Sequence, residues 1–263
     1  MLLKTKLIGC IITHNEEIHI ARSISSLKSL NIPVMVIDSY STDKTFSIAR
    51  NMNAIVIRNE FIDFGIQRAF AINKAKELDF EWMIFLDADE YLTEELKNEI
   101  SSTKLDLDID GFRIKRKVFW NGKWLKYGGY YPIRFLRIFN INKASLSRGI
   151  NEHILVCGKV QDLNFDFVDD NLHGIDRWIQ KHIKYSSYES EEWICNGLSG
   201  LTLQYRILRS IPLILQPVVY FIYRVIIRGG FRNGINGIWF FMFHSVVLIG
   251  LTAFKYSNRI KKS

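Results

Sequence analysis

The sequence contains few cysteines. The three that are present, Cys10, Cys157 and Cys195, lie far apart and form no Cys-x-x-Cys pair. This spacing argues against a disulfide framework and against a cysteine-based zinc site. Cys10 lies inside an apolar run and is expected to be a small core residue.

The sequence also lacks internal repeats, low-complexity linkers and an N-terminal signal peptide. Residues 1–6 lead directly into a predicted strand, without the apolar helix and cleavage site of a secretory signal. We therefore expect the N-terminal part of the chain to stay in the cytoplasm.

The composition is typical of a folded protein with an anionic partner. The 263 residues are 48% hydrophobic, enough for one large domain or a domain with an appendage. The net charge is +8 and the isoelectric point is about 9.3. These values suit nucleic acid, a nucleotide, a phosphorylated glycan or an acidic membrane face, and charge alone does not choose among them.

Short β-rich runs alternate with amphipathic helices between residues 6 and 102. This alternation predicts parallel βαβ units and an α/β fold class. Thr93 is expected to cap the last helix, whose first turn is acidic. The predicted strands are 7–13, 33–38, 54–58 and 82–86, and the predicted helices are 16–30, 43–52, 67–78 and 94–100.

Strands and turns dominate from residue 111 onward. Strands are predicted at 111–120, 134–139 and 154–156, and Asn121-Gly122 indicates a hairpin turn. A further helix is predicted over 175–188.

The last third contains two strongly apolar stretches, 211–227 and 235–254, separated by a segment rich in arginine and glycine. Each is close to the roughly 20 residues that cross a bilayer. Polar residues interrupt both, and a spanning hairpin would export the arginine-bearing loop against the positive-inside tendency.

Helices embedded in the membrane interface therefore fit better than spanning helices. Arg224, Arg228 and Arg232 recur at helical spacing, with Trp239 among the apolar residues that follow. The alternative is a pair of buried helices that pack against the core or a second subunit.

The apolar run Trp82 to Leu86 ends in three carboxylates, those of Asp87, Asp89 and Glu90. Such a run predicts a buried strand, and open α/β sheets bind ligands at the carboxyl ends of their strands. Two aspartates two residues apart suit hard Mg²⁺ or Mn²⁺. Asp-x-Asp alone is a weak motif, but its position after a buried strand favours a metal site over a solvated turn.

Polar clusters also follow the first and second predicted strands. The first is Thr13-His14-Asn15-Glu16, and the second extends from Asp38 to Thr45. In a parallel sheet these ends converge with the Asp-x-Asp end on one edge. Helix capping is an equally good explanation for Thr13 and Asn15, and Ser41 and Asp43 could serve only to start a helix.

Taken together, these segments resemble the family 2 glycosyltransferases, which are inverting nucleotide-sugar enzymes with a single α/β domain of the type called GT-A. The resemblance rests on residues 11–16, 36–43, 65–68 and 85–90 and covers roughly the first 110 residues.

The resemblance implies a Rossmann-like domain over residues 1–200, with a nucleotide-sugar half at 1–110 and an acceptor half at 111–200. It implies a divalent metal, Mg²⁺ or Mn²⁺, on Asp87 and Asp89. Residues 201–263 would form a membrane-association region. The implied contacts to the nucleotide sugar come from Thr13, Asn15, Glu16, Asp38, Ser41, Asp43, Gln67, Arg68, Asp87 and Ala88.

The remainder of the chain is similar to the subgroup that adds glucose to the inner core of lipopolysaccharide. The similarity rests on Glu152 and on residues 178–185 and 230–234, although Asn151 and Asn233 stand where that subgroup has His and Asp. It implies a UDP-hexose donor, a lipopolysaccharide-core or other cell-envelope glycan as acceptor, and Glu152 as catalytic base. Alternatively, Glu152 only pairs with Arg148 or His153.

Two further clusters have open roles. The aromatic side chains near residue 125 could form a platform for a sugar ring or simply pack a hairpin. Asp169, Asp170 and His173 form a polar cluster in which His173 is a candidate contact for metal or diphosphate. The aromatic residues are Trp120, Trp124, Tyr127, Tyr130 and Tyr131.

Two other functional classes are compatible with part of the sequence. A metal-dependent phosphatase or nucleotidyltransferase can also end a strand in Asp-x-Asp, but phosphatases of that type need this strand early in the chain, and here it is the fourth. A non-enzymatic, basic membrane-associated binding module is the other class. Binding of nucleic acid is not expected, because no recognition helix or RNP-like motif appears. The expected location is cytoplasmic, peripheral on the inner face of the cytoplasmic membrane.

Overall fold

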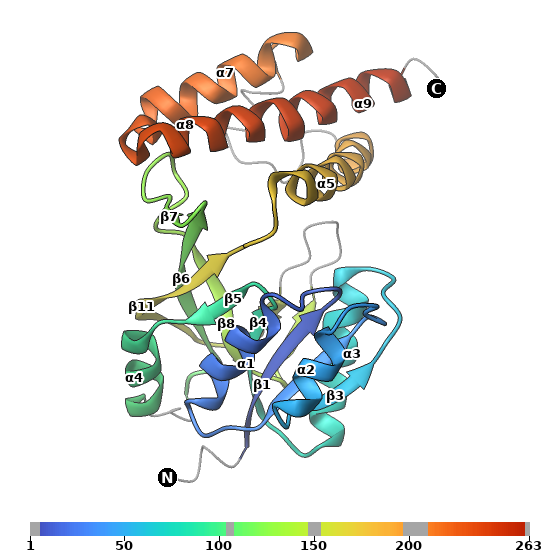
Figure 1. Cartoon of the computed structure of the whole chain (residues 1–263), viewed down its shortest axis with the longest axis vertical. Helices are drawn as coiled ribbons and strands as arrows, with labels where there is room; N and C mark the ends of the chain where they lie inside the picture. The colour runs from blue at the N-terminus through green and yellow to red at the C-terminus, as the bar shows by residue number, and fades with distance from the viewer. Residues whose placement is uncertain (1–5, 104–107, 147–153, 197–209, 261–263) are drawn as a thin grey trace. The chain divides into compact units, whose positions relative to one another are not determined.

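The computed structural model describes residues 6–103, 108–146, 154–196 and 210–260. The chain forms two compact units (Figure 1). The first comprises Met1–Phe119 and Pro132–Leu172, and the second comprises Trp120–Tyr131 and His173–Ser263. The boundary expected at residue 200 lies outside the described residues, so the division into 1–200 and 201–263 stays a prediction.

A mixed sheet forms the centre of the first unit (Figure 1). Its strands follow the order β3-β2-β1-β4-β8-β6-β11-β5. The first four, β3 (Ile55–Arg58), β2 (Val34–Asp38), β1 (Leu7–Thr13) and β4 (Trp82–Asp87), are parallel neighbours. This confirms the α/β class and the parallel arrangement predicted from the first hundred residues.

The other half of the sheet contains antiparallel pairs. Strand β8 (Arg134–Asn140) is antiparallel to β4 and to β6 (Gly111–Trp120), whereas β11 (Val160–Asp170) is parallel to β6 and antiparallel to β5 (Glu90–Leu92). Strands β9 (Ala144–Leu146) and β10 (Ile154–Val156) form a separate antiparallel pair.

Helices cover both faces of the parallel half. Helices α1 (Ile20–Lys28), α2 (Thr45–Asn51) and α4 (Glu94–Ser102) pack into one apolar cluster with side chains from one face of the strands. Helix α3 (Phe64–Glu77) packs into a second cluster with the opposite face. All seven residues of β1 are buried, because both of its faces are covered.

Two helices begin elsewhere than expected. Helix α3 begins at Phe64, three residues before the predicted start, because the Asp63 carboxylate caps it by accepting the N–H of Ile66 at 2.7 Å. Helix α1 begins at Ile20 rather than at residue 16, and the amides of Glu16 and Glu17 before it donate to the side chains of Thr45 and Asp43. Thr93 caps α4 as predicted.

The second unit contains β7 (Lys123–Trp124) and a set of helices. Helix α5 (Ile175–Asn196) is one long helix, whereas both apolar stretches, predicted to be helical, are broken. The first consists of η1 (Leu213–Leu215), α7 (Gln216–Ile222) and η2 (Tyr223–Ile227). After the turn η3 (Gly230–Asn233), the second consists of α8 (Gly234–Phe243), η4 (His244–Gly250) and α9 (Leu251–Ile260). Segments η2 and η4 are π-helical, which widens the helix locally.

The turn after β6 agrees with the hairpin predicted from the sequence. Asn121 and Gly122 both have positive φ, 48° and 70°, as a two-residue hairpin turn requires.

Among the described residues, no single helix is both long and apolar enough to cross a bilayer. Leu213–Ile227 and Gly230–Val247 meet that criterion only as a pair, bent by 72°.

Two histidines lie in an aromatic cluster of the second unit. The His182 ring stacks on Trp178 with centroids 3.7 Å apart, and the His244 ring stacks on Tyr220 at 5.6 Å. Burial lowers the pKa of His182 to about 4 and that of His244 to about 3. Both rings are therefore neutral in the folded protein at neutral pH.

A buried ion pair joins two distant strands of the first unit. Glu90 of β5 and Arg137 of β8 are 2% and 8% exposed, and the Arg137 guanidinium donates to the Glu90 carboxylate. The other oxygen of Glu90 accepts the N–H of Asp87 at 3.0 Å. Burial raises the pKa of the Glu90 carboxyl, and Arg137 opposes this shift by favouring the ionised form.

The second unit should lose stability in mild acid. Unfolded histidine takes up a proton near pH 6.5, whereas His182 and His244 resist protonation down to a pKa of about 4 and about 3. The free energy of unfolding should therefore fall as the pH drops below about 6.5. In His244→Phe the free energy of unfolding should fall less steeply with decreasing pH, by up to about 1.4 kcal/mol per pH unit. Urea unfolding at several pH values measures this change with pH. Phe240→Leu is the packing control: it should lower the free energy of unfolding by the same amount at every pH. If the free energy of unfolding of wild type and of His244→Phe changes equally with pH, the prediction is refuted.

Removing Arg137 should destabilise the first unit strongly. Arg137→Met leaves the Glu90 carboxylate buried without its cation, which should cost about 3–5 kcal/mol. Arg137→Met combined with Glu90→Gln should recover part of the loss, because no unpaired charge remains. As a control, Arg113→Met breaks an exposed pair with Asp162 and should cost no more than about 1 kcal/mol. Urea unfolding compares the variants, and equal losses at Arg113 and Arg137 would contradict the buried-pair interpretation.

Candidate functional site

The polar ends of β1, β2 and β4 lie side by side in the sheet. Thr13 is paired with Asp38 in the β1–β2 register, and Ile12 is paired with Asp87 in the β1–β4 register. The three segments expected to converge therefore meet at one carboxyl edge, where open α/β sheets place their ligands.

Two buried polar groups face this edge from β1 and β2. The Asp38 carboxylate is fully buried, accepts the N–H of Ser41 at 3.2 and 3.3 Å, and lies 3.7 Å from Arg58 Nε. The Thr13 hydroxyl is buried and makes no hydrogen bond within the described residues. A buried carboxylate beside a hydroxyl with unused hydrogen-bonding capacity suits a ligand that brings N–H and O–H groups.

The loops after β1 and β2 are joined by hydrogen bonds. Asn15 has φ 54°, its amide donates to Ser41 Oγ at 2.9 Å, and its side-chain oxygen accepts the N–H of Thr42 at 2.8 Å. Asp43 accepts from the amides of Glu17 at 3.1 Å and Thr45 at 2.9 Å. These residues fix the loop geometry, and whether they also contact a ligand stays a prediction.

Gln67 supports the second of these loops from α3. Its side chain is 1% exposed, donates to Ser39 Oγ at 2.9 Å and accepts from Asn59 Nδ2 at 2.6 Å. These contacts hold the residue that follows Asp38, so the structure gives Gln67 a positioning role at this edge.

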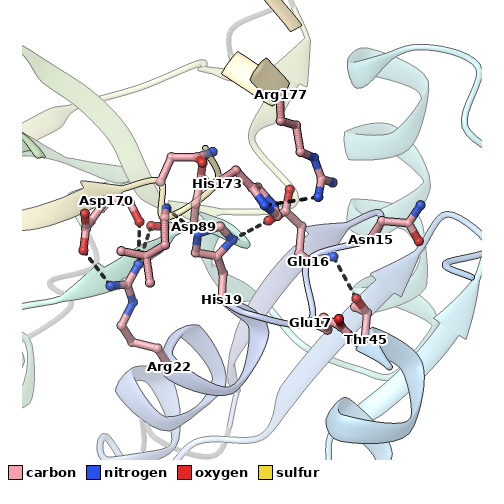
Figure 2. Close-up of polar contacts among 12 residues, drawn as sticks. Asn15, Glu16, Glu17, His19, Arg22, Thr45, Asp89, Asp170, His173 and Arg177 are labelled. Atoms are coloured by element: carbon pink, nitrogen blue, oxygen red, sulfur yellow. Dashed lines mark hydrogen bonds and ion pairs between the residues drawn. The ribbon is translucent and has the colours of Figure 1, made fainter. Parts of the chain in front are cut away.

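Glu16 is oriented by a buried histidine that the sequence did not single out (Figure 2). His19 Nε2 accepts the N–H of Leu172 at 2.7 Å, which leaves the proton on Nδ1 to be donated to Glu16 Oε2 at 2.5 Å. The Glu16 amide donates to Thr45 Oγ1 at 2.8 Å. The carboxylate of Glu16 is therefore held by His19, and His19 is in turn held by the segment that follows β11.

The Asp-Ala-Asp-Glu segment alternates between outward and inward side chains. Asp87 and Asp89 are half-buried, whereas Ala88 and Glu90 are 4% and 2% exposed. Glu90, the third carboxylate after the apolar run, is buried and paired with Arg137, so the predicted metal carboxylates are Asp87 and Asp89 alone. The two remaining carboxylates are hard oxygen donors, the type that Mg²⁺ or Mn²⁺ prefers, so these residues fit a divalent ion.

The end of β11 holds Asp89 in place (Figure 2). Asn171 Nδ2 donates to Asp89 Oδ2 at 2.9 Å, and the Asp170 amide donates to the Asp89 carbonyl at 3.2 Å. Arg22 of α1 donates to Asp170 Oδ2 at 2.7 Å, and Asp169 lies 3.3 Å from Arg116. The polar cluster noted at Asp169 and Asp170 is therefore support for the Asp-Ala-Asp loop.

The remaining residues predicted for the site or as contacts to metal or diphosphate are Arg68, His173 and Glu152. The Arg68 guanidinium lies over the rings of Phe64 at 5.7 Å and Phe85 at 5.6 Å. His173 belongs to the second unit, where Arg177 Nη1 lies 3.2 Å from its Nδ1. Glu152 lies outside the described residues. Their roles stay predictions.

Four supporting residues escaped the sequence analysis: His19, Arg22, Arg137 and Asn171. Each acts through a partner at least three residues away, and for Arg22 and Asn171 the partners lie up to 148 residues away. Only the acidic end of β11 signalled that this region belonged to the site.

Known proteins support the same interpretation of the chain. The family model described as Glycosyl transferase family 2 matches residues 10–155, more than half of the chain. An uncharacterized glycosyltransferase of Rickettsia typhi is 29% identical over 71% of this chain and 68% of its own length. One of Rickettsia conorii is 26% identical over 89% of this chain and 84% of its own length.

Solved structures of low sequence identity also align with the chain. Staphylococcus aureus TarS 1–349 in complex with UDP-GlcNAc is 14% identical over 98% of this chain and 92% of that one, with a TM-score of 0.48. The mannosyltransferase PcManGT of Pyrobaculum calidifontis, in complex with GDP-Man and Mn²⁺, is 13% identical over 98% of this chain and 75% of that one, with a TM-score of 0.47. The family model, together with the α/β sheet and the polar edge, shows that this chain belongs to glycosyl transferase family 2.

Proposed function

We propose that the chain is an inverting, metal-dependent hexosyltransferase. It transfers a hexose, expected to be glucose, from a nucleotide sugar, expected to be a UDP-sugar, to a glycan of the lipopolysaccharide core or another cell-envelope glycan. The observation that supports this most is the edge where Thr13, Asp38 and Asp87 meet, because it places a buried hydrogen-bonding pair beside two carboxylates suited to a metal.

The nucleoside would bind at the ends of β1 and β2. Asp38 is placed to accept a hydrogen bond from a base N–H or a ribose hydroxyl, and the Thr13 hydroxyl has unused bonding capacity beside it. Gln67 and Ser41 would keep this pocket in shape through their contacts to the loop after β2. Such preorganised groups lower the cost of ordering a bound donor.

The diphosphate would bind at Asp87 and Asp89 through a divalent metal. When bound, the metal supplies positive charge that stabilises the departing diphosphate, a contribution worth several kcal/mol. Asp89 is held by Asn171, and Asp87 by the pair of Glu90 and Arg137, so both carboxylates are positioned before the donor arrives. Arg68 is proposed to add a fixed positive charge to the same phosphates.

Inversion requires a base on the face of the sugar opposite the leaving group. We assign this role to Glu152, which would take the proton of the acceptor hydroxyl as that oxygen attacks the anomeric carbon. The support is its place in the sequence, where the glucose-adding subgroup has a glutamate. The acceptor is proposed to be held at the inner face of the cytoplasmic membrane, where the enzyme is peripheral.

A metal-site prediction follows for Asp89. Asp89→Ala should abolish transfer and also the Mn²⁺-dependent binding of UDP, because one of two metal carboxylates is lost. Isothermal titration with UDP, with Mn²⁺ or with EDTA, measures binding, and release of UDP from UDP-glucose measures turnover. Asp79→Asn, at an exposed carboxylate after α3, is the control and should behave as wild type. Metal-dependent UDP binding that survives in Asp89→Ala would refute the assignment.

A different pattern is expected for Glu152. Glu152→Gln should lower transfer by about 10²–10⁴-fold, the range for loss of a general base, while Mn²⁺-dependent UDP binding stays normal. Glu77→Gln, on the exposed end of α3, serves as the matched control. Transfer at the wild-type rate by Glu152→Gln would remove the base assignment. Comparing UDP-glucose with other UDP-hexoses and with GDP-mannose tests the donor.

A further inference from the structure

The net positive charge of the chain comes from its C-terminal part. The last 71 residues contain nine Lys and Arg and no Asp or Glu, which leaves 26 Lys and Arg against 27 Asp and Glu in the first 192 residues. The net charge of +8 therefore comes entirely from the C-terminal part. Such a separation points to an anionic partner for the C-terminal part alone.

Within the second unit, the loop around Gly128 is interlocked with the helices. Arg224 donates to the Gly128 carbonyl at 2.9 Å, and the Gly128 amide donates to the Arg228 carbonyl at 3.0 Å. Asn233 pairs with the backbone of Tyr127 through two hydrogen bonds, at 3.0 and 3.2 Å. Two segments about a hundred residues apart thus form one structure.

This interlock gathers cations around a glycine. Gly129 has φ 82°, and a Cβ there would lie 2.7 Å from Arg224 Nη1 and 3.1 Å from Arg228 Nε. The Arg232 guanidinium lies 4.1 Å from the centre of the Tyr127 ring, and Lys126 Nζ lies 5.9 Å from the same ring. Lys126, Arg228 and Arg232 are exposed. Like charges this close repel, and an anion bound among them would offset that repulsion.

Exposed apolar side chains lie on η2, η3 and α8, close in the chain to Arg228 and Arg232 (Figure 1 shows α8). We call these side chains, together with Lys126, Arg228 and Arg232, the basic-apolar surface. They are Ile226, Ile227, Phe231, Ile235 and Trp239, which are 64%, 70%, 55%, 62% and 48% exposed. A soluble anion would satisfy the cations but leave these side chains in water, whereas the headgroup region of a bilayer accommodates both kinds.

We propose that the basic-apolar surface binds a bilayer of anionic phospholipid. Arg228, Arg232 and Lys126 contact headgroup phosphates, and the apolar side chains enter the boundary between headgroups and acyl chains. The inference deepens and rests on the proposed function, which already places the enzyme at the membrane: it names the lipid chemistry and the residues, and its test does not depend on the transfer reaction.

Flotation of the full chain with vesicles tests the charge requirement. The chain should bind vesicles of phosphatidylcholine mixed with phosphatidylglycerol and bind much less to phosphatidylcholine alone. Arg228→Gln with Arg232→Gln should weaken binding to the anionic vesicles by about 30-fold, the effect of losing two juxtamembrane cations. Lys76→Gln with Lys159→Gln removes the same charge from exposed positions of the first unit and should bind as wild type.

The apolar requirement is tested by Ile227→Ser with Phe231→Ser. This variant keeps every charge and should also lose binding to anionic vesicles, whereas attraction by bulk charge alone would leave binding intact and overturn the proposal. Equal binding to neutral vesicles, or unchanged binding of the double arginine variant, would overturn it as well.

Two other occupants would also overturn the proposal. One is inorganic phosphate, if it saturates the surface and abolishes vesicle binding at physiological concentration. The other is a second copy of the chain, if sedimentation shows a dimer that the serine variants dissociate. Release of UDP from UDP-glucose in the absence of vesicles should be unaffected in the arginine and serine variants. A failure of the proposed transferase function would instead appear in every variant, wild type included.

Discussion

The structure of the first unit depends on cations that neutralise several carboxylates at one edge of its sheet. The ends of β4, β5 and β11 bring acidic groups together, and isolated charges of one sign are costly where water is scarce. Three arginines from three different elements supply the opposing charge: Arg22 from α1, Arg116 from β6 and Arg137 from β8. The mixed half of the sheet supplies two of these three cations, Arg116 and Arg137, and so stabilises the carboxylates at the end of the parallel half.

Much of the parallel half could be predicted from the sequence, because its signals are local. Fully buried strands appear as apolar runs, and the helices between them have a regular apolar face. Strands β5 and β11 were missed because their pairing is not local and because polar residues interrupt the apolar pattern of Val160–Asp170. The pairing of Glu90 could not be predicted for the same reason: its partner Arg137 lies 47 residues away, and no local pattern links the two.

In the second unit, two motifs that the sequence shows separately are joined by hydrogen bonds in the structure. The glycines and tyrosines near residue 128 and the arginine- and glycine-rich segment near residue 230 were both noticed in the sequence. Their hydrogen bonds show that they are one feature. The breaks in the apolar stretches were not foreseen, because π-helical segments leave no signature in the spacing of apolar residues.

Strand β11 contains an irregularity that bears on how the strand would accommodate an inserted residue. Its register with β6 shifts between Asp162 and Asp166, before the strand reaches the residues that hold Asp89 and His19. A bulge absorbs an extra residue without changing the pairing beyond it. A residue inserted into the first half of β11 should therefore be absorbed at this irregularity, which would leave Asp169–Leu172 aligned with their partners Asp89 and His19.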